Sequence, residues 1–176
     1  MKFLKIIIVT SFLILSTFTH AKDTSNAKME SELLLKFLLP KAEYFLKKNG
    51  GFYPLAATLN YKKEIITLAT YNGNEFPKST DLIQDLNQAF QLGGQKKEYK
   101  ATGMIYDIKL TSVATGKKTD ALVVALDHVD HYSILITLPY QLKNNEIIYQ
   151  KSFANEGDYK IFQQLDKQTN ICLIGC

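Results

Sequence analysis

The sequence predicts an α+β fold, a mainly antiparallel sheet of five to six strands with two principal helices in the order α-β-β-α-β-β-β. Two segments place apolar residues three or four positions apart, which is typical of amphipathic helices. The other apolar segments are rich in β-branched and aromatic residues, as strands are. The later strands are joined by connections too short for parallel crossovers, which predicts antiparallel pairing. We expect both helices to cover one face of the sheet.

The first helix is predicted after a polar N-terminal stretch, residues 22–30, which we expect to be flexible. Its apolar residues recur at helical spacing: Leu34, Phe37, Leu38, Ala42, Phe45 and Leu46. Pro40 lies inside this pattern and has no N–H to donate, so we expect a kink or two short helices. Gly50-Gly51 should end the helix.

The second helix is predicted over residues 80–92, with one apolar face made of Leu82, Ile83, Leu86 and Phe90. We expect Ser79 or Thr80 to cap its start and Gly93-Gly94 to stop it. A short third helix is predicted over 159–165.

The predicted strands cover residues 52–61, 64–71, 99–111, 121–127, 132–140 and, more weakly, 147–153. The chain turns at Asn72-Gly73-Asn74, and a tight turn at Val129-Asp130 joins the two most apolar strands. In the third strand Met104, Tyr106, Ile108 and Leu110 alternate with Ile105, Asp107, Lys109 and Thr111. We expect Tyr106 on the core side and Asp107 on the other face.

The first 21 residues predict an export signal. Lys2 and Lys5 precede an apolar stretch over 6–18, and the segment ends on Thr19-His20-Ala21, a site suited to signal peptidase. A retained anchor is the alternative, but a spanning helix needs about 20 apolar residues. We therefore predict a bacterial protein that is periplasmic or secreted. Its parts are a signal peptide (1–21), a flexible N-terminus (22–30), one domain (31–166) and a tail (167–176).

Charge and composition disfavour several classes of partner. Cleavage after Ala21 would remove two lysines and no acid, so the net charge would fall from +4 to +2. All 21 basic residues are lysine, and arginine is the preferred residue for bidentate phosphate binding. We therefore predict no nucleic-acid partner and, after signal cleavage, no membrane partner.

The two cysteines, Cys172 and Cys176, lie in the last five residues. In an oxidising compartment we expect them to form a disulfide, which would stabilise little because the loop is so short. Pairing between chains, or free thiols, are the alternatives. The spacing differs from that of a C-x-x-C redox site.

A resemblance to a known family rests on the order and spacing of several short motifs along the chain. These are Phe52-Tyr53-Pro54 with Ala56-Ala57, Tyr106-Asp107, Asp120-Ala121, His128, Leu138-Pro139-Tyr140, and Phe153 with Lys160-Ile161-Phe162. Over residues 33–162 the chain resembles a widespread family of small uncharacterised bacterial α+β proteins. No activity is established for that family, so the resemblance implies no catalytic residues. Its members are mostly cytosolic and acidic, whereas this chain is mildly basic and carries an export signal. The element order is also analogous to that of roadblock- and profilin-like folds.

The segment Asp127-His128-Val129-Asp130-His131 combines carboxylates and imidazoles, which bind zinc or copper. Neighbours on a strand point to opposite faces, so Asp127 and His128 cannot easily share one ion. We interpret the segment as a solvated turn and predict neither a metal nor another cofactor. Asp107 and Asp120 are a candidate acid and base, and His128, Asp107 and Ser133 a candidate nucleophilic set, only if the fold gathers them.

Tyrosine is abundant, with ten in the chain. Tyr53 and Tyr140 lie beside Pro54 and Pro139, and proline favours strand edges where a partner can reach. The alternative is that most tyrosines cap the core with their hydroxyls at its rim. The predicted binding residues are Tyr53, Tyr140, Tyr106, Asp107 and His128, and no catalytic residue is predicted.

We expect an exported, non-enzymatic binding protein, an inhibitor or immunity-type protein that binds another protein. The alternative is a small periplasmic hydrolase or metal-dependent enzyme that uses Asp107, Asp127, His128 or His131.

Overall fold

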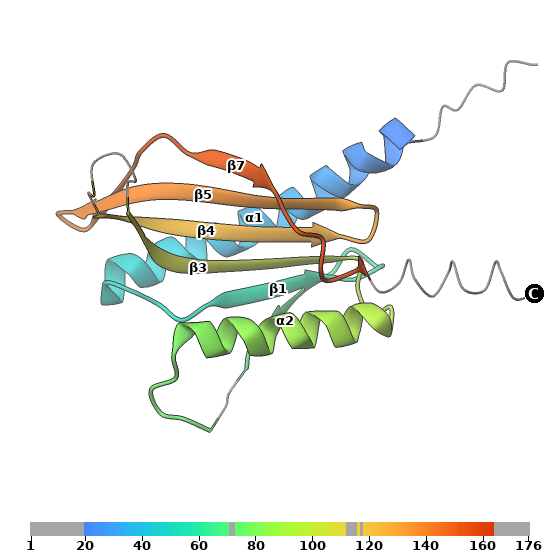
Figure 1. The fold of residues 1–176 in the computed structure, drawn as a ribbon, viewed down its shortest axis with the longest axis horizontal. Helices are drawn as coiled ribbons and strands as arrows, with labels where there is room; N and C mark the ends of the chain where they lie inside the picture. The colour runs from blue at the N-terminus through green and yellow to red at the C-terminus, as the bar shows by residue number, and fades with distance from the viewer. Residues whose placement is uncertain (1–19, 71–72, 112–115, 117, 164–176) are drawn as a thin grey trace, which may run out of the picture.

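The computed structural model describes residues 20–70, 73–111, 116 and 118–163 (Figure 1). The elements are α1 (His20–Asn49), β1 (Leu55–Leu59), β2 (Ile65–Leu68), α2 (Ser79–Gln95), β3 (Ala101–Thr111), β4 (Lys118–His128), β5 (Tyr132–Lys143), β6 (Glu146–Tyr149) and β7 (Phe153–Glu156). This is the predicted α+β fold, and the order of its elements matches the prediction.

The seven strands form one antiparallel sheet in the order β2-β1-β3-β4-β5-β6, and β7 also pairs with β5. β3, β4 and β5 are the long central strands, and the predicted turn at Val129-Asp130 joins the last two. The predicted strand at 147–153 is two strands. β6 pairs with the end of β5, over Tyr140–Lys143, and β7 pairs with its beginning, over Ile134–Thr137.

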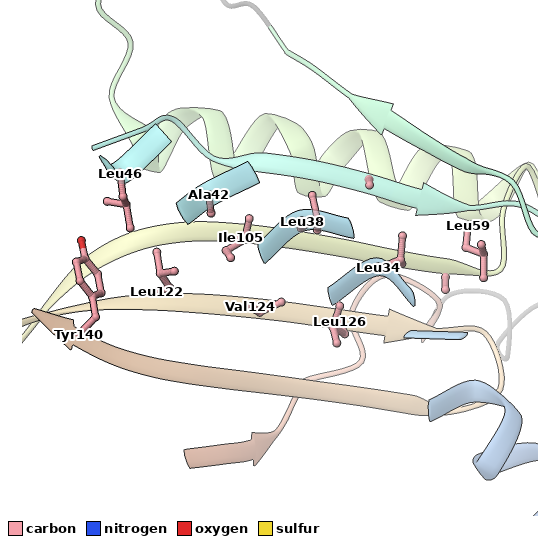
Figure 2. Close-up of a cluster of buried hydrophobic side chains, with 12 residues drawn as sticks. Leu34, Leu38, Ala42, Leu46, Leu59, Ile105, Leu122, Val124, Leu126 and Tyr140 are labelled. Carbon is pink, nitrogen blue, oxygen red and sulfur yellow. The ribbon is translucent and has the colours of Figure 1, made fainter. Parts of the chain in front are cut away.

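The two helices lie on opposite faces of the sheet, so the prediction that both cover one face was wrong (Figure 1). Alternate residues of β3 explain the arrangement, because Ile105 packs in one core cluster and Met104 in the other. Figure 2 shows the α1 cluster, in which Leu34 and Leu38 of α1 lie over the central strands. The α2 cluster contains Phe90 together with Phe162, near the end of the described chain.

Helix α1 is continuous through Pro40, whereas a kink or two short helices were predicted there. It also begins at His20, before the stretch 22–30 that was predicted to be flexible. Leu38 and Ala42, on either side of the proline, are buried in the same cluster, and this packing keeps the helix in one piece. Residues 22–30 were predicted to be flexible, but they lie in the helix, and Ala27 and Glu30 are buried. Gly50 follows the helix with φ +73° and donates its N–H to the Leu46 carbonyl, which confirms the predicted end.

Helix α2 differs from its prediction at both ends. Its N-cap is Lys78, which makes no side-chain cap hydrogen bond, so neither Ser79 nor Thr80 is the cap. Gly93 and Gly94 lie within the last turn instead of ending it. A Cβ at Gly93 would lie 2.5 Å from the Tyr99 ring, so glycine serves close packing here.

Candidate functional site

The five predicted binding residues do not form one site. Tyr53 is 49% exposed, whereas Tyr140 is 4% exposed and His128 is completely buried. Tyr140 packs in the α1 cluster and donates its hydroxyl to Asp107 Oδ1 at 3.0 Å. The expectation that Tyr140 lies at an accessible edge was therefore wrong. Tyr106 packs against the α2 cluster on the other face.

His128 belongs to a buried polar cluster with Glu30 of α1 and Lys100. Its Nε2 lies 2.9 Å from Glu30 Oε2, and Lys100 Nζ donates to Glu30 Oε1 at 2.6 Å. The Asp130 backbone N–H donates to His128 Nδ1 at 3.0 Å, which places the ring proton on Nε2 as the donor to Glu30. Burial raises the pKa of Glu30, but hydrogen bonds from Lys100 and His128, together with the charge of Lys100, bring it below its usual value. This cluster joins α1 to the sheet.

Because the His128 side chain is excluded from solvent, it cannot contact a substrate, and the predicted enzymatic sets that use it have no access. At the adjacent turn, His131 has φ +56° and its ring lies 5.1 Å from that of Tyr159. Among the described residues, no three His, Cys, Asp or Glu side chains are placed to hold a metal ion.

Asp107 and Asp120 lie on the α1 face near the end of the long strands. Burial raises the pKa of Asp107, the Tyr140 hydroxyl lowers it, and the charge of Asp120 raises it again, with a net rise. Asp120 is paired with Lys109, its cross-strand neighbour, at 2.6 Å. Both carboxylates thus have partners from the protein itself.

A cavity of about 810 Å³ lies between the end of α1, the segment 51–56, β2 and the start of α2. Its walls are mainly apolar and include Phe45, Phe52, Leu68 and Leu82. Tyr53 also lines it, and is the one predicted binding residue that does so. Cavities of about 300–1,000 Å³ with apolar walls are typical of binding sites.

β2 is one edge of the sheet, and its outer backbone groups face away from β1. The Leu59 carbonyl accepts a hydrogen bond from the Lys100 N–H, so the backbone groups of Leu59 point toward β3. Its partner on β2, Ile65, therefore forms a non-hydrogen-bonded pair and points its own N–H and C=O to the open edge. The same alternation applies to Thr67, which is exposed and lines the cavity.

Sequence reasoning found Tyr53 but missed the cavity around it. Four separate segments build the walls, and the residues from 67–70 and 74–82 carried no binding pattern of their own. Pro54 was a usable signal, because proline favours strand starts and Pro54 directly precedes β1, which begins at Leu55.

Comparisons with models of protein families, with curated proteins and with solved structures found no match. No described helix has the length and apolar character needed to cross a membrane. Cys172, Cys176 and residues 1–19 of the predicted export signal lie outside the described residues.

Proposed function

We propose that this protein is a non-enzymatic binding protein that captures an extended apolar segment of another protein at the β2 edge. The observation that carries the proposal is the open edge of β2 beside the apolar cavity of about 810 Å³. An added strand gains affinity from main-chain hydrogen bonds and specificity from pockets for its side chains.

The proposed site has both of these parts. Ile65 and Thr67 offer outward backbone groups for the added strand, and the cavity offers an apolar recess for one of its side chains. Lys62 and Lys63, both exposed, precede β2 at its hairpin turn. The partner segment should therefore be extended and apolar, with an acidic residue near the end that meets these lysines.

Site-specific photo-crosslinking tests this proposal in the native cell envelope. A photoreactive phenylalanine at Ile66, which is 50% exposed on β2, should crosslink to a partner through an extended apolar segment. The matched control is Ile148, which is 49% exposed on β6 at the other end of the sheet, and should not capture that partner.

Two proline variants make the test specific for strand addition. Thr67→Pro removes an outward N–H, so it should abolish the crosslink while the protein stays folded. Ile66→Pro removes an N–H that bonds β1, so it should instead destabilise the sheet. Equal crosslinking from Ile66 and Ile148, or a crosslink that survives Thr67→Pro, would contradict the proposal.

Tyr53→Ala is the corresponding test of the cavity. It should weaken partner binding by about 1–3 kcal/mol, as for an aromatic anchor. Because half of the Tyr53 surface is exposed, the melting temperature should change little, and this separates loss of binding from loss of folding.

A further inference from the structure

The outer face of α1, which points away from the sheet, carries five apolar residues that we call the outer stripe. Met29 is 53%, Leu33 38% and Tyr44 56% exposed. The exposed Pro40 and the partly buried Phe37 lie between them. Successive members are three or four residues apart, so they share one face of the helix over about 22 Å. The opposite face of α1 packs on the sheet in the α1 cluster (Figure 2). The helix therefore has two apolar faces, although one is enough to hold it against a sheet.

Four exposed lysines flank the outer stripe. At about 100° per residue, Lys36 and Lys47 lie along one side of it, and Lys41 and Lys48 lie along the other. None of the four forms an ion pair with another described residue. Their positive charge is therefore not neutralised within the described part of the chain, and it lies on both sides of an apolar surface.

The described acidic side chains of α1 lie away from the outer stripe. Glu30 is buried in the polar cluster with His128. Glu43 is turned toward β6, where it accepts a hydrogen bond from the Tyr149 hydroxyl at 2.7 Å. Glu32 is partly buried and lies beyond Lys36. The outer face of the helix is therefore apolar along its middle and positive along its margins.

Two of the lysines lie directly over aromatic rings of the stripe. Lys41 Nζ is 4.4 Å from the centre of the Phe37 ring, and Lys48 Nζ is 5.5 Å from the centre of the Tyr44 ring. Lysine stems cover apolar surface in this way while their ammonium groups stay in a polar medium. A partner that meets the stripe must therefore accept apolar side chains and ammonium groups at nearly the same depth.

Helix α2, on the other face of the sheet, has no such surface. It contains no lysine between Ser79 and Gln95. Its exposed positions are polar, for example Gln84 and Gln88, with the exception of Leu92. The outer stripe is therefore a property of α1, and not one that any helix covering this sheet must have.

We infer that α1 lies on an anionic lipid surface, with the outer stripe in the interface and the flanking lysines among the phosphate headgroups. Apolar side chains bordered by lysines are typical of helices that lie in the plane of a membrane. Negatively charged headgroups supply the opposite charge on both sides of the helix at once. A second copy of the chain fits less well, because the lysines of two stripes would repel each other.

This inference departs from the prediction that no membrane partner binds, which rested on a net charge close to zero. Net charge does not show that four lysines gather on one helix face. The inference is also independent of the β2 site, because no residue of the outer stripe lines the cavity there.

Tryptophan fluorescence of the full chain tests the inference, because the sequence contains no tryptophan of its own. The emission of Tyr44→Trp should shift to the blue when equimolar phosphatidylglycerol and phosphatidylcholine vesicles are added, since the indole enters the interface. Phosphatidylcholine vesicles alone should give a much smaller shift. The control is Phe76→Trp, which is 76% exposed ahead of α2, and its emission should not shift.

Two further changes, made in the Tyr44→Trp chain, assign the binding to the lysines. Lys36→Gln with Lys41→Gln removes one charge from each side, so about tenfold more lipid or more should be needed for half of the shift. Lys78→Gln with Lys96→Gln removes the same charge at the two ends of α2 and should change nothing. Circular dichroism melts establish that each chain is folded.

Four results would overturn the inference. These are an equal shift with neutral vesicles, an equal shift of Phe76→Trp, a shift that does not depend on Lys36 and Lys41, and no shift with anionic vesicles. A blue shift on concentrating the protein without lipid would assign the outer stripe to contact with a second copy instead.

Discussion

Glu30 and Asp127 are both carboxylates packed against the same end of β4, on opposite faces of the sheet. Glu30 has partners on both oxygens, His128 and Lys100, and its pKa lies below the usual value. Asp127 precedes His128 by one residue, points the other way, and has one oxygen without a partner and a raised pKa. Adjacent strand positions therefore differ, with a satisfied network on the α1 face and an unsatisfied carboxylate oxygen on the α2 face.

The same contrast extends over the two faces. On the α1 face Glu30 bonds to His128 and Lys100 and so joins α1 to the sheet, while Tyr140 bonds to Asp107 within the sheet. On the α2 face the helix covers only part of the sheet, and a cavity that contains Asp127 lies beside it. Substitutions in the polar network of the α1 face should therefore destabilise the protein more than substitutions of the polar groups around this cavity.

The largest effect is expected for Glu30→Ala, which breaks the network on the α1 face. It leaves the Lys100 ammonium and the His128 Nε2–H without their acceptor, so it should lower the free energy of unfolding by about 3–5 kcal/mol. Urea denaturation measures the change. Glu146→Ala, at an exposed position of β6, should change stability by less than about 0.5 kcal/mol. If Glu30→Ala lowered the free energy of unfolding as little as Glu146→Ala does, the proposed contrast between the two faces would be wrong.

Gly93→Ala should have the next largest effect on stability, and it tests packing on the α2 face. Alanine normally stabilises a helix relative to glycine by about 1 kcal/mol. Here the added Cβ would meet the Tyr99 ring, whose hydroxyl bonds the Phe90 carbonyl at 2.6 Å. We expect a net destabilisation of about 1–3 kcal/mol in urea denaturation. Gly51→Ala, where a Cβ meets nothing within 4 Å, is the control and should be close to neutral.

Tyr140→Phe compares the tyrosines of the two faces. It removes a hydrogen bond to the half-buried Asp107, so it should cost about 1–2 kcal/mol and raise the pKa of Asp107. Tyr106→Phe on the α2 face should cost less than about 0.5 kcal/mol. Denaturation curves of both variants give the comparison, and equal losses would show that the α2 face depends on its tyrosine hydroxyl as well.

Asp127→Asn should have the smallest effect on stability, and it should be stabilising. Because the folded pKa of Asp127 is above its unfolded value, ionisation at neutral pH works against folding, and the penalty disappears as pH falls. The variant should therefore melt at a slightly higher temperature at pH 7 and equal the parent in acid. The contribution of Glu30 to stability depends on pH in the opposite direction. Because its pKa is lowered in the folded state, its contribution is present at neutral pH and is lost as pH falls through the folded value. Melting curves across pH distinguish the contributions of Asp127 and Glu30. A lower melting temperature of Asp127→Asn at pH 7 would show that the ionised Asp127 carboxylate stabilises the fold.

The sequence by itself determined the element order, the antiparallel pairing and the turn at Val129-Asp130, because periodicity and turn chemistry are local properties. It also predicted Tyr53 as a binding residue from the neighbouring proline, and Tyr53 lines the cavity beside β2. Only the tertiary structure decided which face each helix covers. The neighbouring residues Met104 and Ile105 of β3 are both apolar and point to opposite faces, so the sequence does not say which helix packs on which face. It likewise decided that His128 is buried, since its partner Glu30 is 98 residues away in the chain. The cavities depend on the same long-range packing, because their walls come from segments that meet only after the sheet has formed.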